Sequence, residues 1–600
     1  MMNKSSHMGK ILRVDLTNQN YDIEKIDEDI LFKYIGGRGL GTYYLYKILE
    51  AKADPLSEKN ILIFTTGPLN GTIAPTSGKF GIVTKSPLTN GYLDSYAGGD
   101  FGNKLKSAGF DLLILEGKSP FPVLLRIENE SVEFIDASNL WGKTMSQTNN
   151  FLKENYKGFS FVAIGPAGER LSPISSIFCG TRSLSRGGSG AVMGSKNVKA
   201  IAVNGNRVVD VANKEIFEEG VKEAYRAVRM NSTIKRLSQY GTVQILRFIN
   251  AAGGLPTRNF QTGVFEEAET LFDEKWKAEV FVKDTACPNC PISCSKVAHI
   301  KSDTLGEIVL DGPDYETIFS LGTNCGISDK QAIVYANYLC DEYGIDTIST
   351  GGIIAFVMEA FEKGIIDTNY LDGLEPKWGD VESFIKLVEK ICKAEGVGSE
   401  LQKGVKYLSR KIPGTSNFAM HVKGLEMPAY LPRAGKGIAL SYAVTERGAC
   451  HLHGTPISEL LGEADPKTYE GKAELFLVNQ VMISIIDSAI LCYFTHGAIR
   501  LKEYAKMFRG ATGFEYDVAN LQKFGRRLST LSRLFNIREG KTKDEDNLPR
   551  RSTEEPLTSG PSKGETIDLD VLLEDYYTLM GWDKNGVPTE GTLKALEIDF

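Results

Sequence analysis

The first third of the chain carries short apolar runs separated by turn residues. The clearest are ILIFTTGPL (61–69), KFGIVTKS (79–86), DLLILEG (111–117), FPVLLRIENESVEF (121–134), FVAIGPAGE (161–169) and KAIAVNG (199–205). Runs of this length that are bounded by Gly, Pro and Asn predict β-strands. Within 121–134, apolar and polar residues alternate on both sides of an Asn-Glu-Ser turn. This alternation predicts an antiparallel hairpin and not a βαβ crossover.

After about residue 211 the pattern changes to that of amphipathic helices. Segments 213–230, 329–344 and 381–396 place apolar residues three or four positions apart, which is the spacing of one helix face. The polar stretch 538–566 is expected to form an extended surface segment before a last short helix. The chain therefore predicts an α+β fold, β-rich up to about residue 210 and mostly helical afterwards.

Composition narrows the class of protein. A chain of 600 residues is too long for one ordinary core, so several domains are expected. Its net charge of −7 argues against nucleic acid as the main partner. The most apolar segment, 481–494, is too short to span a membrane and contains Asp487. Because the N-terminus does not have the pattern of a secretory signal, a cytoplasmic protein is expected.

Three of the nine cysteines lie within eight residues. Cys287, Cys290 and Cys294 form a C-x2-C-x3-C pattern, whereas both tetrahedral zinc and a cubane iron–sulfur cluster take four ligands. The second C-x2-C pair of a zinc finger is missing, which favours iron–sulfur over zinc. Cys492 follows an apolar, helix-like run beside Asp487 and is the best-placed fourth ligand; Cys340 and Cys450 remain alternatives.

Glycine clusters in three segments, 34–46, 95–109 and 181–200. Glycine lets backbone N–H groups approach an anion closely, and Lys79, Arg182, Arg186 and Lys196 lie close by in the sequence to neutralise phosphates. Neither a Walker loop nor a dinucleotide-binding fingerprint is present, so ATP and NAD are not favoured. Tight turns remain the alternative explanation of these glycines.

Two further patterns point to chemistry. Asp341 and Asp487 each stand five residues ahead of an Asp or Cys at the end of an apolar run, a weak echo that chance could also produce. Glu316 and Tyr315 follow a Gly-Pro turn, and His451 and His453 follow Arg447-Gly448 in a chain of only six histidines. A carboxylate and an imidazole on turns could act as general base and acid. A helix-capping Glu and a core His are the structural alternatives.

These motifs together resemble the aldehyde ferredoxin oxidoreductase family, tungsten enzymes with a bis-pterin cofactor and a [4Fe-4S] cluster. The resemblance covers essentially the whole chain. It rests on GKILRVDLTN, GPLNGTIAPTSGKFGIVTKSPLT, SRGGSGAVMGSKNVKAIAV, CPNCPISC, GPDYETIFSLG, CDEYGIDTISTGG, IDSAILC and YYTLMGW. It implies a β-rich cofactor-base domain over 1–210 and two mainly helical domains over 211–415 and 416–600.

The resemblance also implies roles for particular residues. Its pterin loops fall on Asp341, Gly344, Ile345 and Asp346, and on Asp487, Leu491 and Cys492, which makes Cys492 the fourth cluster ligand. Glu316 and His451 fall beside the metal, with Tyr315 next to them. Segments that bind the cofactor phosphates contain Lys79, Arg182, Arg186, Gly187 and Gly188. The backbone carbonyls of Tyr96 and Ser183 are implied as ligands of a magnesium ion that bridges the pterin phosphates.

Several positions depart from the family pattern. Ile490 replaces a Gly, so the backbone there is expected to avoid a left-handed conformation or to be reshaped. Lys79 replaces an Arg and lacks its bidentate fork. Tyr96 and Ser183 replace an Asn and an Ala, which backbone ligation tolerates. Tyr335 and Tyr338 occupy the positions of a Glu and His pair that can hold an iron between subunits, so an oligomer without that iron is expected.

The resemblance implies an oxidoreductase that converts an aldehyde and water to a carboxylic acid. Tungsten is expected rather than molybdenum, and electrons are expected to leave through the cluster to ferredoxin or to an iron–sulfur subunit. One alternative is a related catalytic subunit that acts on an aromatic thioester or reduces a carboxylic acid. The other is a metal-binding electron carrier without substrate chemistry.

Overall fold

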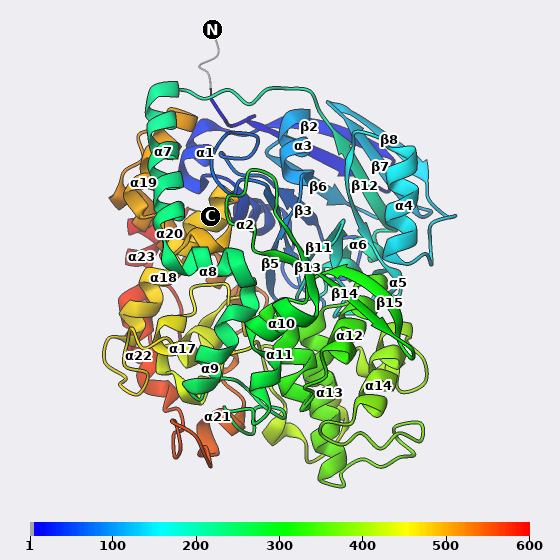
Figure 1. Cartoon of the computed structure of the whole chain (residues 1–600). Coiled ribbons are helices and arrows are strands. Elements are labelled where there is room, and N and C mark those ends of the chain that lie inside the picture. Colours follow the sequence, from blue (N-terminus) through cyan, green and yellow to red (C-terminus); the bar gives the residue numbers. More distant parts are fainter. Residues whose placement is uncertain (1–4, 600) are drawn as a thin grey trace.

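The computed structural model describes residues 5–599, and two six-stranded sheets dominate its N-terminal part (Figure 1). The first sheet has the order β2-β1-β6-β3-β4-β5, with bounds Asn20–Lys25, Lys10–Asp15, Leu112–Glu116, Leu62–Thr65, Lys79–Lys85 and Tyr92–Gly98. The second has the order β11-β10-β9-β12-β7-β8, with bounds Arg182–Leu184, Ile177–Cys179, Ser160–Ile164, Val198–Asn204, Val123–Glu128 and Ser131–Asp136.

The expected hairpin is confirmed. Strands β7 and β8 pair antiparallel, with Glu128 opposite Ser131, and Asn129 in the turn has a positive φ of 53°. Asn tolerates this left-handed conformation better than most residues, which suits a tight two-residue turn. Both sheets are mixed, because β1 pairs parallel with β6 and β7 pairs parallel with β12.

The two sheets share one hydrophobic core. Phe64 and Phe80 from the first sheet belong to the same buried cluster as Val162 and Ile201 from the second. Apolar side chains that alternate along each strand therefore meet between the sheets. Six short helices connect these strands: α1 (Glu28–Tyr34), α2 (Gly37–Ile48), α3 (Phe101–Ala108), α4 (Met145–Asn155), α5 (Pro166–Glu169) and α6 (Ser189–Ser195).

Helices form most of the rest of the chain; most of them lie below the sheets in Figure 1, whereas α7 and α19 lie beside the sheets. Up to residue 411 they are α7 (Lys214–Met230), α8 (Ser232–Tyr240), α9 (Leu246–Ala251), α10 (Asp273–Glu279), α11 (Tyr315–Leu321), α12 (Lys330–Tyr343), α13 (Thr347–Glu362), α14 (Val381–Lys393), α15 (Gly398–Leu401) and α16 (Val405–Lys411). Later in the chain come α17 (Lys436–Val444), α18 (Lys472–Ala489), α19 (Leu501–Thr512), α20 (Val518–Arg538), α21 (Arg550–Glu554), α22 (Leu569–Met580) and α23 (Glu590–Ala595).

Two small sheets interrupt the helical part. One contains β13 (Phe281–Thr285), β14 (Ser295–Ser302) and β15 (Gly306–Asp311), and its first two strands flank the cysteine loop. The other pairs β16 (His421–Val422) with β17 (Leu425–Glu426). The predicted α+β class, with a β-rich part before a mostly helical part, is confirmed. The division of the helical part at residue 415 stays a prediction, because one hydrophobic core contains residues from both sides of it.

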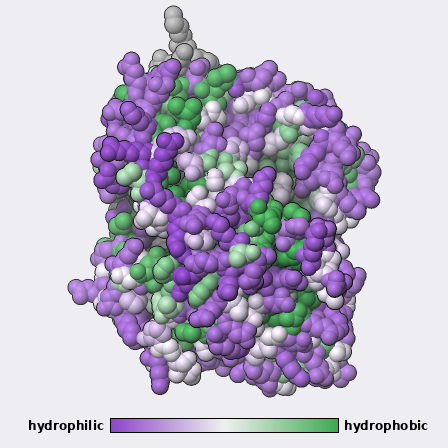
Figure 2. All heavy atoms as spheres, viewed as in Figure 1, coloured by the Kyte–Doolittle hydropathy of each residue, from purple (hydrophilic) through white to green (hydrophobic). Residues whose placement is uncertain are grey.

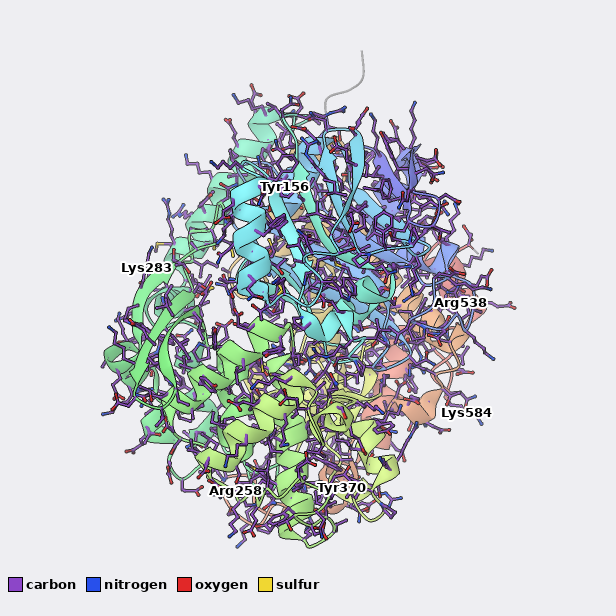
Figure 3. The ribbon with its side chains drawn as sticks, turned by 90° about the vertical axis from the view of Figure 1, so that its right-hand side faces the viewer. Tyr156, Arg258, Lys283, Tyr370, Arg538 and Lys584 are labelled. Atoms are coloured by element: carbon purple, nitrogen blue, oxygen red, sulfur yellow. The ribbon has the colours of Figure 1, made fainter. Side chains whose placement is uncertain are left out.

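No helix within residues 5–599 is long and apolar enough to cross a bilayer. The expectation of an extended surface segment over 538–566 is wrong, because the segment contains α21 and several buried charges. Arg551 is 4% exposed and binds Glu359 of α13, which is fully buried. Two helices, α22 and α23, follow this segment instead of one. Figure 3 shows Lys283 on β13 at one edge of the molecule and Lys584 at the opposite edge.

Candidate active site and cysteine loop

The two aspartate loops occupy equivalent positions on two helices. Asp341 lies in the last turn of α12 and Asp487 in the last turn of α18. Each helix ends in a left-handed residue three positions later, Gly344 with φ 76° and Ile490 with φ 56°. The sequence echo therefore corresponds to two helix ends with the same backbone form, in which an αL residue turns the chain into a loop.

Ile490 overturns one expectation. The backbone neither avoids the left-handed conformation nor is reshaped, since Ile490 adopts it despite its branched side chain. The surroundings hold it there: the residue is 1% exposed, and a side chain added at Gly37 would lie 2.9 Å from its Cδ1. The N–H of Leu491 also donates to the carbonyl of Ile486 at 3.0 Å, which closes the end of α18.

The first loop is attached to the N-terminal part of the chain. The backbone of Ile345 bridges to Ser175, and the carbonyl of Gly344 accepts from the N–H of Ser176 at 2.9 Å. Asp346 caps α13 by accepting from the N–H of Ile348 and forms an ion pair with Arg186 at 3.2 Å. Arg186 thus links the glycine-rich segment before α6, which Gly188 begins as N-cap, to the first aspartate loop.

The four predicted cluster cysteines gather at one place. Cys290 and Cys294 pack against the hydrophobic cluster that contains Ile292 and Leu491, directly beside Cys492. The N–H of Cys492 donates to Thr76, and the N–H of Thr76 donates to the carbonyl of Asn289 in the cysteine loop. These four thiols are partly exposed, whereas the other five cysteines of the chain are buried.

The two alternatives for the fourth ligand have other partners. Cys340 contacts Cys392 and donates to Thr350 at 3.8 Å. The sulfur of Cys450 accepts from Arg447 at 2.7 Å and from the N–H of Leu452 at 3.3 Å. The geometry therefore favours Cys492.

No three of the four sulfurs lie as close together as a bound zinc ion would require. Zn–S bonds of about 2.3 Å would bring four sulfurs to within roughly 4 Å of one another. Among the described residues only Asp94, His453 and Asp487 place three ligand atoms within 4.8 Å of one another, so the cysteine set is more open than a zinc site. Burial raises the pKa of the Cys290 thiol to about 11, and a bound metal centre would stabilise its thiolate.

Cationic residues and the first sheet surround the cysteine loop. Lys79 opens β4, and although burial alone would lower its pKa, the nearby Cys492 and Cys287 raise it. Burial opposes the charge of Arg182 as well, yet its ion pair with Asp311, at 3.2 Å, raises its pKa. A Cβ at Gly98, the last residue of β5, would lie 2.4 Å from the sulfur of Cys287, so only glycine permits this approach.

The two implied magnesium ligands lie on neighbouring strands. Tyr96 is in β5 and Ser183 in β11, and these strands pack side by side. The hydroxyl of Ser95 donates to the carbonyl of Ser185 at 2.8 Å, which fixes the two strands together. The hydroxyl of Tyr96 donates to Asp94 at 2.7 Å. The side chain of Tyr96 is therefore bound to Asp94, whereas the implied role concerns only the backbone carbonyl.

Glu316 and His451 face each other in a buried position. The Oε1 atom of Glu316 lies 3.6 Å from Nε2 of His451, and both side chains are 15% exposed. The Oε2 atom of Glu316 accepts from the N–H of Ala429 at 3.0 Å. Burial raises the pKa of Glu316 to about 8 and lowers that of His451 well below its usual value. At neutral pH the carboxyl of Glu316 is therefore mainly protonated, and the imidazole of His451 is neutral.

Tyrosines enclose this pair. Tyr315 lies next to Glu316, but its hydroxyl donates to the carbonyl of Ala429 at 2.9 Å, so it positions the segment that also binds the carboxylate. The ring of Tyr430 lies 6.4 Å from that of His451. Tyr442 is fully buried near Glu316 and its hydroxyl has no partner among the described residues. Sequence reasoning missed Tyr442, which the helical window of α17 does not distinguish from core residues.

Sequence reasoning marked His453 but missed the rest of a buried polar network next to the second loop. Arg38 forms ion pairs with Asp94 and Glu446, each at 3.2 Å. Nε2 of His453 lies 3.1 Å from Asp94, and Arg447 donates to the Asp94 carbonyl at 2.6 Å. Arg38 stands in a glycine cluster and Arg447 precedes His451, which are weak signals, but nothing in the sequence around Asp94 singles it out.

The residues fit a large polar cofactor. Buried polar atoms without a protein partner are rare in folded chains, and each indicates a ligand or water. Within the described residues, seven of these atoms lie near the two aspartate loops: Oε1 of Glu316, Nδ1 of His451 and His453, Oδ1 of Asp94, Oδ2 of Asp487, Nε of Arg447 and the hydroxyl of Tyr442. Burial also raises the pKa of Asp487 to about 8, which makes it a possible hydrogen-bond donor to a ligand.

Comparison with known proteins agrees with this geometry. The family model for the N-terminal domain of aldehyde ferredoxin oxidoreductase matches residues 11–205, and the model for its domains 2 and 3 matches residues 219–598. The chain belongs to the aldehyde ferredoxin oxidoreductase family. It is an oxidoreductase of this family, so the expectation of an enzyme is confirmed over that of a non-catalytic electron carrier.

Relatives within the family span the full chain. The tungsten-containing aldehyde ferredoxin oxidoreductase of Pyrococcus abyssi is 41% identical and covers 99% of both chains. A protein of Pyrococcus furiosus named aliphatic sulfonate oxidoreductase, WOR-like subunit, is 32% identical over 99% of this chain and 97% of its own. Among solved structures, the active-site complex BamBC of benzoyl-coenzyme A reductase with 1,5-dienoyl-CoA is similar, with a TM-score of 0.83, 25% identity and coverage of 99% and 97%.

Proposed function

We propose that this enzyme oxidises an aldehyde with water to a carboxylic acid, using a tungsten bis-pterin cofactor and a [4Fe-4S] cluster. The observation that carries the proposal is the buried pair of Glu316 and His451, whose facing atoms lie 3.6 Å apart. Oε1 of Glu316 and Nδ1 of His451 have no hydrogen-bond partner among the described residues. A relative with the same activity in its name shares 41% of the sequence over its whole length. When bound, the pterin-held metal supplies the two-electron oxidation and the cluster supplies a one-electron exit.

The residues that would hold these groups follow from the site. Asp341, Ile345, Asp487 and Leu491 would contact the pterins, and Lys79, Arg182 and Arg186 would neutralise their phosphates. The backbone of Tyr96 and Ser183 would bind the bridging magnesium. Cys287, Cys290, Cys294 and Cys492 would hold the cluster.

Glu316 is suited to act as the general base. Its raised pKa, about 8, lies close to neutral pH, where a base is most efficient. It would take a proton from the attacking water or from the hydrated aldehyde. The neutral imidazole of His451 would donate a hydrogen bond to the carbonyl oxygen as negative charge builds on it. The tyrosines around the pair would exclude bulk water from both groups.

The decisive experiment is the Glu316→Gln variant, purified without oxygen. Gln keeps the shape and the hydrogen bond to Ala429 but removes the base, so turnover of aldehydes with a dye acceptor should fall by roughly 10²–10⁴-fold. Tungsten, iron and sulfide contents should equal those of the wild type. A fully loaded variant that oxidised aliphatic and aromatic aldehydes at the wild-type rate would contradict the mechanism.

An alternative substrate is the main competing possibility, because similar proteins are named for sulfonate oxidation and for benzoyl-coenzyme A reduction. Retention of both Glu316 and His451 supports the aldehyde. A panel of aldehydes, sulfonates and aromatic thioesters assayed with one preparation would separate them. Elemental analysis of the same preparation would distinguish tungsten from molybdenum.

We also propose a cytoplasmic location and an oligomer, where one forms, without an iron between subunits. All nine cysteines are free thiols, as a reducing compartment requires. The hydroxyl of Tyr335 binds Glu389 of α14 at 2.9 Å and cannot reproduce a carboxylate ligand. Iron in excess of one four-iron cluster per chain, retained at a subunit interface, would contradict the second statement.

A further inference from the structure

One stretch of the helices that cover the cysteine loop carries only positive charge. Residues 224–265 contain no Asp or Glu but six Lys and Arg, in a chain with a net charge of −7. This stretch includes the end of α7 and all of α8, which lie on the face toward the viewer in Figure 1. Charge of one sign that gathers in one segment of an acidic protein indicates a surface for a partner of opposite sign.

Two acidic residues of α7 form ion pairs with another helix. Glu219 and Glu223 form ion pairs with Lys506 of α19, at 2.8 and 3.0 Å. Arg226, Arg229 and Lys235 are exposed, and none forms an ion pair with any residue in the part of the chain that the structure describes. Two of the four acidic residues of α7 therefore share one lysine of α19, whereas the end of α7 and the start of α8 keep three exposed cations without an ion-pair partner among the described residues.

The free basic side lies over the cysteine loop. The guanidinium of Arg229 stands 5.6 Å from the ring centre of Tyr225, and Tyr225 packs against the same hydrophobic cluster as Cys290 and Cys294. The side chain of Asn231, between α7 and α8, donates to the carbonyl of Gly497 in the loop after Cys492. Both segments that supply cysteines are thus covered by the junction of these two helices.

Contacts from α8 confirm this position. A Cβ at Gly241, which follows α8, would lie 3.1 Å from the carbonyl of Cys294. Lys296, two residues after Cys294, donates to the carbonyl of Ser238 at 2.6 Å and pairs with Asp284 at 2.9 Å. The carboxylate of Asp284, beside the loop, is therefore paired with Lys296. Met230 adds an apolar contact at 71% exposure, and Figure 2 shows a mostly hydrophilic face with small separate hydrophobic patches.

We propose that Arg226, Arg229 and Lys235 form the docking surface for a small acidic iron–sulfur electron carrier, which accepts electrons from the cysteine-bound cluster. The inference rests on the proposed function, because it assigns the partner of the same electron path. Free cations around one exposed apolar side chain are typical of transient electron-transfer interfaces, where charge attracts and orients the partner. The carrier leaves with one electron per encounter, so that two encounters complete each aldehyde oxidation.

The test uses the anaerobically purified holoenzyme and an acidic [4Fe-4S] ferredoxin. The triple variant R226E/R229E/K235E reverses the surface, and Lys584→Glu is the matched control because Lys584 is exposed on the opposite edge of the molecule (Figure 3). Calorimetric Kd values at low and high salt measure docking. Turnover with a small dye measures the chemistry, and iron content verifies the cluster.

The triple variant should bind ferredoxin about tenfold more weakly or worse at low salt, with a flatter salt dependence. Dye-coupled turnover and iron content should equal those of the wild type, and the control should bind normally. Unchanged ferredoxin affinity in the triple variant would overturn the proposal, as would wild-type affinity for ferredoxin that does not respond to salt. Equal binding of a short DNA duplex would reassign the surface to nucleic acid.

These outcomes are separate from those of the proposed function. If the wild type fails to oxidise any aldehyde with the dye but binds ferredoxin through these three residues, the docking surface stands and the substrate assignment falls. If aldehyde oxidation is normal but ferredoxin binding does not depend on the three residues, the substrate assignment stands and the docking surface is wrong.

Discussion

Glu316 is a buried carboxyl with a proposed role as general base. A carboxyl that burial holds at a pKa of about 8 is mainly protonated at neutral pH, and it becomes a base as the pH rises. We expect kcat/KM for aldehyde to increase about tenfold per pH unit below pH 8 and to level off above it. Because the folded-state pKa is raised, the stability contributed by the neutral carboxyl is full at low pH and is lost as pH rises toward 8.

The pH profile is measured with a dye acceptor whose own potential does not change with pH. The Glu316→Gln variant should show a low rate without this slope. A wild-type profile that is flat between about pH 6 and 9 would remove Glu316 from the proton transfer.

Cys492 lies far along the sequence from the other cluster cysteines, yet Thr76 ties it to the cysteine loop. Replacing it with Ser removes a soft ligand that iron requires, so we expect less iron and sulfide per chain and a weaker electron paramagnetic resonance signal. Cys392→Ala is the control, since Cys392 is buried beside Cys340. If both variants had the same cluster content, Cys340 or Cys450 would again be a candidate for the fourth ligand.

At the scale of elements, the end of β5 sets the position of the cysteine loop. Strand β5 ends at Gly98, where a Cβ would meet the Cys287 sulfur at 2.4 Å. Gly98→Ala should therefore displace the loop and reduce the iron content while the sheet still folds. Gly591→Ala is the control because nothing lies within 4 Å of its added Cβ. Full iron content in Gly98→Ala would show that the loop can move aside.

At the scale of the whole molecule, a buried ion pair ties segment 538–566 to α13. Arg551 donates to Oε2 of Glu359 at 2.8 Å, across 192 positions of sequence, and Glu359 is fully buried. Arg551→Met would leave that charge without its main partner, so the free energy of unfolding should fall by roughly 3–5 kcal/mol.

Denaturant unfolding of the apo chain measures this loss. The double variant Arg551→Met with Glu359→Gln should recover much of the stability, because no buried charge is then left unpaired. Glu554→Gln, at an exposed position in α21, should leave the unfolding midpoint unchanged. A single Arg551→Met variant as stable as the wild type would show that the segment is held by apolar contacts alone.

Local sequence determined the elements of this protein. The hairpin of β7 and β8 was predicted because alternation along the strands and an Asn-led turn act over only a few residues. The loop of Cys287, Cys290 and Cys294 was predicted for the same reason, since metal-ligand spacing is visible within eight residues. By contrast, segment 538–566 has a polar composition whose charges are buried only because partners such as Glu359 meet them from distant helices.

The site itself depended on tertiary structure. Motifs marked Glu316 and His451, but their separation of 3.6 Å arises only when α11 and the segment after α17 pack together. Asp94 and His453 are 359 positions apart and Arg38 and Glu446 are 408 apart, and none of these pairs has a local pattern. Neighbouring residues decide backbone conformation through short-range sterics and periodic burial, so the sequence alone revealed helices, strands and ligand spacings. Long-range charge pairing and desolvation depend on which elements meet in space. Only the tertiary structure decides which elements meet.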